Sequence, residues 1–180
     1  MKVSKENLTR FTKVCLKKLG ASSENASVVS NRLVYADQTG HISHGSIRLT
    51  HYKRNIELGI LKPDIEPIIT SQNESYVKVD SKRSFGQVAA KKLTEVMFDK
   101  YLENKNVVIG ALVNSNHVGR IVDYPEIYTE DDIACISFVN GGGPGVAPHG
   151  SVERKLGTNP ISFFLRSGKE KISIDVATAS

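Results

Sequence analysis

Three histidines, an arginine and a tyrosine fall within the stretch from Gly40 to Tyr52. If a helix begins at Ser43, whose hydroxyl is a suitable N-cap, then His44, Arg48 and Tyr52 recur every four residues and share one face. An arginine binds a carboxylate through two parallel hydrogen bonds, and an imidazole exchanges a proton near neutral pH. The pattern suits a small carboxylic acid, although a basic, solvated helix face explains these residues equally well.

A fourth histidine follows a predicted strand. Residues 107–113 are almost continuously apolar, which is typical of a strand buried on both faces, and Asn116 and His117 come directly after it. Catalytic groups gather at the carboxyl ends of strands in α/β sheets. His117 is therefore a candidate catalytic residue, with Asn116 available to fix its tautomer or to bind substrate. An imidazole that only satisfies its own loop is the alternative.

A glycine-rich turn, residues 141–145, follows the apolar run 133–139. Glycines allow the backbone to approach a ligand closely, but a flexible connector is the commoner role of such a turn. The spacing G-x-G-x-x-G is absent, and no Gly-Lys-Ser or Gly-Lys-Thr follows. A nicotinamide cofactor that binds here does so without the Rossmann motif. Asp175, at the end of the last predicted strand, is placed to accept a ribose hydroxyl or to cap a helix.

The periodicity of apolar residues predicts helices and strands in alternation, which indicates a mixed α/β fold. The first helix has its apolar face at Leu8, Phe11, Cys15 and Leu19 and stops at Gly20. We expect helices over residues 4–20, 23–40, 43–59, 86–101 and 121–128, and strands over residues 76–80, 107–113, 133–139, 161–165 and 172–176. Pro63 and Pro67 bracket a connector that cannot continue a helix.

These elements predict two domains. Residues 1–62 form a helical subdomain that carries Ser43, His44 and Arg48. Residues 63–180 form an α/β sheet domain with the His117 loop and part of a cofactor site.

Composition favours an ordinary globular protein: 39% of its 180 residues are apolar and 24% are charged. The net charge is +5, but the lysines are scattered over helix faces, so nucleic-acid binding is not expected. Neither a secretion signal nor a run long enough to span a membrane is present, and a cytoplasmic protein is expected.

Metal binding and disulfide formation are not indicated. No two of the five histidines are spaced i, i+4, and the two cysteines, Cys15 and Cys135, have no CxxC spacing. Both cysteines lie in apolar patterns and are predicted to be small buried hydrophobic residues.

Four short motifs together resemble the malate/L-lactate dehydrogenase family, which includes sulfolactate, ureidoglycolate and diketogulonate oxidoreductases. The motifs are Ser43-His44-Gly45 with Arg48, Asn114-Ser115-Asn116-His117-Val118-Gly119, Gly157-Thr158-Asn159-Pro160 and Asp175-Val176-Ala177-Thr178. The resemblance implies a non-Rossmann fold that binds NAD or NADP. It also implies a cytoplasmic homodimer that transfers hydride between the nicotinamide and a small 2-hydroxy or 2-oxo acid.

The resemblance also implies roles for individual residues. His117 is the base that takes the hydroxyl proton on oxidation, with His44 as its rival or partner. Arg48 holds the substrate carboxylate, and Tyr52 lines the pocket. Further substrate contacts are Ser43, Asn116 and Asn159. Cofactor contacts are Asn140, Gly141, Gly142, Asp175, Val176, Ala177 and Thr178. His41 and His51 are expected on the surface.

The chain departs from the family in two ways. The turn at residues 141–145 is richer in glycine than the family pattern, and family members are roughly twice as long. The chain thus resembles an amino-terminal half. Its sequence leaves two interpretations open: a dehydrogenase, or an inactive truncated remnant or interaction domain without a complete cofactor site.

Overall fold

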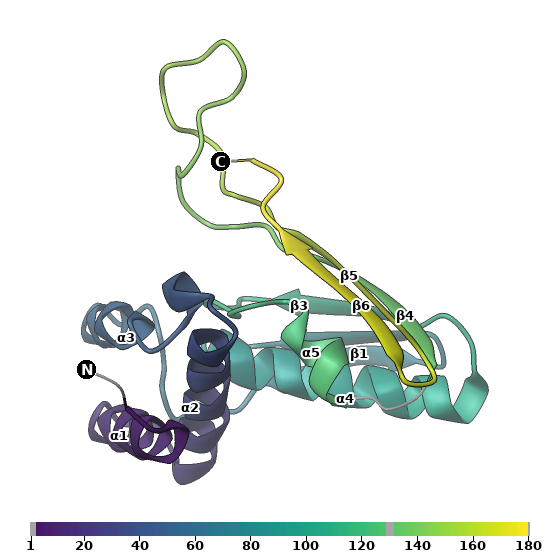
Figure 1. The fold of residues 1–180 in the computed structure, drawn as a ribbon, viewed down its shortest axis with the longest axis horizontal. Coiled ribbons are helices and arrows are strands. Elements are labelled where there is room, and N and C mark those ends of the chain that lie inside the picture. The colour runs from purple at the N-terminus through teal and green to yellow at the C-terminus, as the bar shows by residue number, and fades with distance from the viewer. Residues whose placement is uncertain (1–2, 129–131, 180) are drawn as a thin grey trace. The chain divides into compact units, whose positions relative to one another are not determined.

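The computed structural model describes residues 3–128 and 132–179. The chain divides into two compact units, Met1–Gly119 (unit 1) and Arg120–Ser180 (unit 2) (Figure 1). The expected domain boundary at residue 62 falls inside unit 1. Phe85, from the sheet part of unit 1, packs in the same hydrophobic cluster as Leu16 and Leu33 from the helical part, and this shared core joins the two parts.

Unit 1 begins with helices α1 (Lys5–Lys18) and α2 (Ser23–Gln38), which pack against each other. Each has a serine cap: the Ser4 hydroxyl accepts from the Asn7 amide, and the Ser22 hydroxyl from the Asn25 amide. In α2 four apolar residues recur at spacings of three and four in the sequence, and all four are buried. They are Ala26, Val29, Leu33 and Ala36.

The apolar face predicted for α1 is wrong. The helix buries Thr12 and Leu16, whereas Phe11 is 60% exposed and Cys15 is half-buried. Thr12 and Leu16 are one turn apart, so they form a single ridge, and that ridge is rotated from the one the hydrophobic spacing indicated. Cys135 is half-buried as well, and burial raises the pKa of its thiol to about 11.

The predicted helix start at Ser43 is also wrong. Residues Ile42–His44 form a 3₁₀ turn, η1, and α3 (Arg48–Glu57) begins four residues after His44. The cause is Asp37, whose carboxylate accepts a hydrogen bond from the Ser46 amide at 2.9 Å. A Cβ at Gly45 would lie 1.7 Å from that carboxylate, so any larger residue where the chain bends between η1 and α3 would displace the Asp37 side chain from this position.

The sheet of unit 1 has the order β1 (Ile68–Asn73), β2 (Tyr76–Asp80) and β3 (Ile109–Val113). β2 pairs antiparallel with β1 and parallel with β3, and α4 (Gly86–Asn104) makes the crossover and packs on both parallel strands. Strand β1 was not predicted, because only two of its six residues are apolar. β3 is not buried on both faces, because Ile109 is 62% exposed and the other residues of the strand are half-buried.

Unit 2 contains the short helix α5 (Asp123–Tyr128) and an antiparallel sheet of β4 (Ile133–Phe138), β5 (Ile161–Ser167) and β6 (Glu170–Val176). The order β4-β5-β6 places β5 in the centre. The predicted positions of all three strands and of α5 are confirmed. The expected end of that helix adjoins residues 129–131, which lie outside the described residues.

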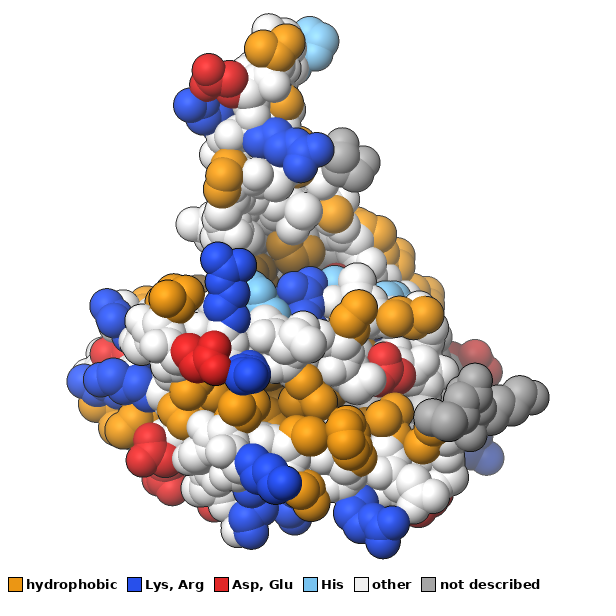
Figure 2. Space-filling model, turned by 90° about the vertical axis from the view of Figure 1, so that its left-hand side faces the viewer, with side chains coloured by type: hydrophobic (Ala, Val, Ile, Leu, Met, Phe, Trp, Pro, Cys, Tyr) orange, Lys and Arg blue, Asp and Glu red, His pale blue; other side chains and the backbone are white. Residues whose placement is uncertain are grey.

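On the face drawn in Figure 2, Lys and Arg side chains are spread among acidic and apolar side chains and form no continuous stripe. None of the described helices is both long and apolar enough to cross a membrane.

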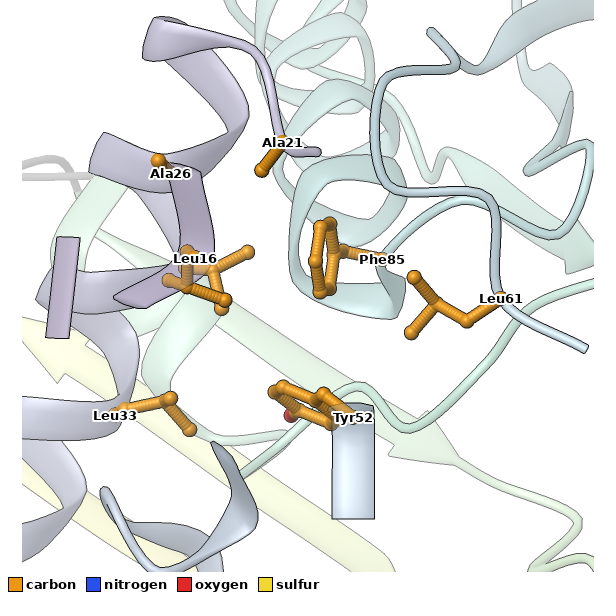
Figure 3. Close-up of a cluster of buried hydrophobic side chains, with 8 residues drawn as sticks. Leu16, Ala21, Ala26, Leu33, Tyr52, Leu61 and Phe85 are labelled. Carbon is orange, nitrogen blue, oxygen red and sulfur yellow. The ribbon is translucent and has the colours of Figure 1, made fainter. Parts of the chain in front are cut away.

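The hydrophobic core of unit 1 lies where α1, α2 and α3 meet the segment that leads into α4. Figure 3 shows Leu16 and Leu33 from α1 and α2 facing the rings of Phe85 and Tyr52. The two rings meet edge to face, with centroids 5.6 Å apart. Tyr52 is 1% exposed, so the core fixes the position of a side chain that also carries a reactive hydroxyl.

Replacing Leu16 with alanine is expected to lower the free energy of unfolding by about 2–5 kcal/mol, because a fully buried leucine leaves a cavity. Leu58, which is 60% exposed, provides the matched control. Leu58→Ala is expected to change the free energy by less than about 0.5 kcal/mol. Urea unfolding followed by circular dichroism measures both values, and equal losses would contradict the described core.

Candidate active site

His117 lies in the loop that follows β3, and two contacts hold that loop against the start of α4. The side-chain amide of Asn116 donates to the carbonyl oxygens of Arg83, at 2.8 Å, and Ser84, at 3.1 Å. A Cβ at Gly86 would lie 2.3 Å from the Asn116 carbonyl oxygen and 2.4 Å from that of His117. The loop therefore packs backbone to backbone on α4. The Asn116 amide that was expected to bind substrate is already engaged in fixing this loop.

The half-buried His117 and two buried side chains, Tyr52 and Gln87, form a continuous hydrogen-bond chain at this point. The Tyr52 hydroxyl lies 2.9 Å from Nδ1 of His117, and the Gln87 amide nitrogen donates to the same hydroxyl at 2.5 Å. Tyr52 and Gln87 are almost completely buried. Within the described part of the chain, Nε2 of His117 and Oε1 of Gln87 have no hydrogen-bond partner. This hydrogen-bond chain thus ends in a buried histidine nitrogen that has no hydrogen-bond partner among the described residues.

Two further predicted residues face this group from the segment around η1. The His44 ring stacks on the His117 ring, with centroids 5.3 Å apart and an interplanar angle of 30°. Arg48 is at the start of α3 and donates through Nε to the Ser43 carbonyl oxygen at 2.5 Å. That bond uses one edge of the guanidinium and leaves its terminal N–H groups for other acceptors. The Ser43 hydroxyl pairs with Nδ1 of His44 at 3.0 Å.

The environment holds His117 in its neutral form. Burial is the largest of the causes that lower the pKa of His117 to about 3, followed by the coulombic effects of Arg48, His44 and His51 in that order. Burial also raises the pKa of Tyr52 well above its usual value, against the opposing effects of the Gln87 hydrogen bond and of Arg48. Both groups of the pair are therefore uncharged near neutral pH.

His44, Arg48, Tyr52 and His117 thus come together in unit 1, although not on the single helix face that the sequence indicated. The bend at Gly45 brings His44 back toward Arg48. His51 is exposed, as expected of a surface residue, but its ring meets that of Tyr52 edge to face at 6.5 Å. His41 is exposed and hydrogen-bonds to the Thr39 carbonyl oxygen.

The predicted cofactor residues all lie in unit 2, at one end of its sheet. Asn140, Asn159 and Thr178 line one surface pocket together with apolar side chains such as Phe138 and Ile161. Apolar walls with a few polar groups are typical of small-molecule sites.

The loops that form this pocket are tied to each other. The Asn159 side chain accepts from the Gly141 amide at 3.0 Å, and the Thr178 hydroxyl donates to the Asn159 carbonyl oxygen at 2.9 Å. A Cβ at Gly157 would lie 1.7 Å from the Gly141 carbonyl oxygen. The glycine at 157 is needed for this close approach, whereas Gly142 faces open space.

Asp175 makes a contact that the sequence did not indicate. Its carboxylate accepts a hydrogen bond at 3.1 Å from the backbone amide of Val122, in the turn before α5. It therefore fastens an earlier segment to β6. Val176 and Ala177 are exposed beside it.

Sequence reasoning missed Asp37, Gly86 and Gln87, which position the four grouped residues. Gln87 lies one residue after the expected helix start, where a glutamine is commonly solvated, and only its burial reveals its role. Gly86 was noted as a helix boundary, and the close approach it permits depends on a loop about thirty residues away. Among the described residues, no group of three or more His, Cys, Asp or Glu side chains is arranged to hold a metal ion.

Comparison with known proteins identifies the family. Residues 3–180 match the family model described as malate/L-lactate dehydrogenase. L-sulfolactate dehydrogenase from Methanocaldococcus jannaschii is 34% identical over 97% of this chain and 50% of its own length. The malate dehydrogenase from Pyrococcus abyssi is 34% identical over 99% of this chain and 49% of its own length.

Solved structures agree with the sequence matches. Sulfolactate dehydrogenase from Methanocaldococcus jannaschii superposes with a TM-score of 0.91 at 34% identity, over 100% of this chain and 52% of that one. Malate dehydrogenase from Pyrococcus horikoshii OT3 gives a TM-score of 0.90 at 32% identity, over 99% of this chain and 51% of that one. The chain therefore belongs to the malate/L-lactate dehydrogenase family. It spans about half the length of the relatives it matches.

The burial of His117 predicts how stability depends on pH. Unfolded, a histidine takes up a proton near pH 6.5, whereas folded His117 stays neutral down to about pH 3. Since the unfolded state binds the extra proton between these values, stability falls as pH drops from about 6.5 toward 3. The loss from this group is at most about 1.4 kcal/mol per pH unit.

Urea unfolding between pH 7 and pH 4.5 measures this slope. His117→Asn is expected to reduce the slope, and the exposed His149 provides the control substitution His149→Asn. A slope that His117→Asn leaves unchanged would show that His117 is not held neutral in the folded protein.

Proposed function

We propose that this chain carries the proton-transfer and carboxylate-binding groups, and part of the cofactor site, of an NAD(P)-dependent oxidoreductase for small 2-hydroxy and 2-oxo acids. The observation that carries the proposal is the position of His117, hydrogen-bonded to Tyr52 and stacked on His44, where desolvation lowers its pKa and favours the neutral ring. It is supported by the names of the relatives, which are sulfolactate and malate dehydrogenases.

Arg48 is proposed to bind the substrate carboxylate. Its Nε–H already holds the Ser43 carbonyl oxygen, which orients the guanidinium plane and reduces the conformational entropy lost on binding. The two terminal nitrogens then provide the pair of parallel hydrogen bonds that a carboxylate accepts. Electrostatic attraction between Arg48 and a 2-oxo acid would also offset the cost of desolvating the acid in this half-buried place.

His117 is proposed to exchange the proton with the substrate oxygen through Nε2. Because Gln87 donates to the Tyr52 hydroxyl, the tyrosine proton is directed to Nδ1 of His117, and Nε2 then carries the ring proton. In this arrangement His117 donates to the oxygen of a 2-oxo acid while that acid is reduced. His44, stacked on His117, is placed to be a second proton carrier to solvent.

The opposite arrangement serves the oxidation of a 2-hydroxy acid. If the Gln87 amide turns so that Oε1 accepts from Tyr52, the tyrosine oxygen is free to accept from Nδ1–H. Nε2 is then an unprotonated base facing the substrate hydroxyl. Oε1 of Gln87 has no hydrogen-bond partner within the described residues, so no described contact opposes this turn. The two directions of one hydrogen-bond chain thus match the two directions of the reaction.

The cofactor site is proposed to include the unit 2 pocket and to be non-Rossmann. A bound nicotinamide would supply or accept the hydride at C2 of the acid. Asn140 and Thr178 line the pocket, and Gly142, where even an added Cβ would have no atom within 4 Å, leaves backbone accessible to a ligand. Asp175 fits the ribose less directly, because one carboxylate oxygen is already bonded to the Val122 amide. Either NAD or NADP is compatible with these groups.

A second candidate function is that of an inactive remnant or an interaction domain, which would not have a complete cofactor site. It is favoured by one observation, that the chain spans about half the length of its relatives. A titration of the 180-residue chain with NADH and NADPH, followed by nicotinamide fluorescence, distinguishes the two. Saturable binding supports the dehydrogenase, and absence of binding supports the interaction domain.

The activity itself is tested by the loss of reduced nicotinamide in the presence of oxaloacetate, pyruvate or sulfopyruvate. His117→Ala is expected to lower kcat by about 10²–10⁴-fold, the usual contribution of a positioned acid or base. Arg48→Lys is expected to raise KM more than it lowers kcat, because the ammonium cannot make two parallel hydrogen bonds. No turnover with any acid, or full activity in His117→Ala, would overturn the proposal.

The hydrogen-bond chain makes a prediction that does not depend on activity. Nitrogen NMR of labelled protein is expected to find the His117 proton on Nε2. Gln87→Met removes the donor to Tyr52 at similar volume, so the tyrosine oxygen becomes free to accept from His117 and the population with the proton on Nδ1 rises. Gln38→Met, at the exposed end of α2, is the matched control. Unchanged His117 signals in Gln87→Met would contradict this role of Gln87.

A further inference from the structure

One face of the unit 2 sheet is apolar across its whole width. The strand register aligns three rows of side chains, each crossing β4, β5 and β6. Paired residues in an antiparallel sheet point to the same side, and alternate residues along a strand share that side. The rows are Ala134-Leu165-Ile172, Ile136-Phe163-Ile174 and Phe138-Ile161-Val176, and these nine residues are called the apolar sheet face.

The apolar sheet face is largely exposed to solvent. Phe138 is 75% exposed, Ile136 61% and Ile172 57%. The remaining large members, apart from the half-buried Ile161, are between 41% and 48% exposed. No polar or charged residue interrupts the three rows. A contiguous apolar surface of this kind marks an interaction site, whereas scattered apolar residues do not.

The opposite face of the same sheet is different in composition and already has contacts within unit 2. There Asp175 holds the Val122 amide before α5, and Lys171 pairs with Glu126 of α5. Ser162 and Phe164 on this side are 1% and 2% exposed. A sheet that carries apolar residues on both sides requires a layer on each of them. The apolar sheet face is the side whose layer is absent from the described part of unit 2.

The length of the relatives indicates what that layer is. The solved sulfolactate dehydrogenase from Methanocaldococcus jannaschii contains a match to this entire chain, and the match accounts for only 52% of that protein. About as much polypeptide again is thus present in that relative, and an exposed apolar face is a surface on which it could pack. We propose that the apolar sheet face is the docking surface for a polypeptide equivalent to the part of the relatives that this chain does not match.

Reactivity of a single thiol on the face tests this proposal. Ile174→Cys, in the middle row and on β6, is introduced after Cys15→Ser and Cys135→Ala remove the native thiols. The 180-residue chain is compared with the same chain extended by the unmatched part of the sulfolactate dehydrogenase. Maleimide modification is expected to be at least about tenfold slower in the extended chain. Val152→Cys, at a position that is 100% exposed, is the control and is expected to react at the same rate in both.

Two outcomes would overturn the proposal. Equal reactivity of Ile174→Cys in the two chains means that the added polypeptide does not cover the face. Slow reactivity in the 180-residue chain that increases on dilution means that a second copy covers it instead. Folding of the extended chain is checked by a cooperative thermal transition, and its absence also counts against docking.

A second variant tests the same surface without a thiol. Phe163→Lys places a charge in the middle row and is expected to lower the melting temperature of the extended chain by several degrees more than that of the 180-residue chain. Val107→Lys, at an 80% exposed apolar position in unit 1, is the matched control and is expected to act equally on both. Equal effects of Phe163→Lys on the two chains would contradict the proposed docking.

Discussion

The hydrogen bond between the Tyr52 hydroxyl and His117 is the contact on which the candidate active site depends. Tyr52 belongs to the core of unit 1 through its ring and to the site through its oxygen. The bond therefore joins a helix that comes early in the chain to a loop that follows β3. Because a buried hydroxyl needs hydrogen-bond partners, closing the core around the Tyr52 ring places His117 and Gln87 at its oxygen. Packing of the Tyr52 ring in the core and placement of His117 in the candidate active site therefore depend on each other.

Glycines make this arrangement sterically possible. Gly45 leaves room for the Asp37 carboxylate at the bend before α3, and Gly86 leaves room for the backbone of the His117 loop against α4. At each position the space of one methyl group is taken by a polar atom of another segment. The histidine, arginine and tyrosine side chains around His117 therefore depend on residues that have no reactive group of their own.

The same burial that positions the site also sets its chemistry. Removing His117 and Tyr52 from water favours the uncharged form of each, so that proton transfer runs along a neutral hydrogen-bond chain. In unit 2 the opposite condition holds, because an apolar sheet face and an open pocket remain in contact with solvent. The chain matches about half of each relative. We therefore expect some of its surfaces to be covered by its own residues, as around His117, and others to require a further layer, as on the apolar sheet face.

The sequence by itself determined the apolar periodicity of α2, the strand positions of unit 2, the family, and the residue types of the site. These are local patterns, or motifs that can be matched one by one. It did not determine the buried ridge of α1, the existence of β1, the bend at Gly45 or the role of Gln87. The last two are decided by groups distant in the chain: Asp37 bends the segment before α3, and Tyr52 gives Gln87 its partner. Only the tertiary structure brings such groups within hydrogen-bonding or van der Waals distance, because the energies that choose between local alternatives come from burial.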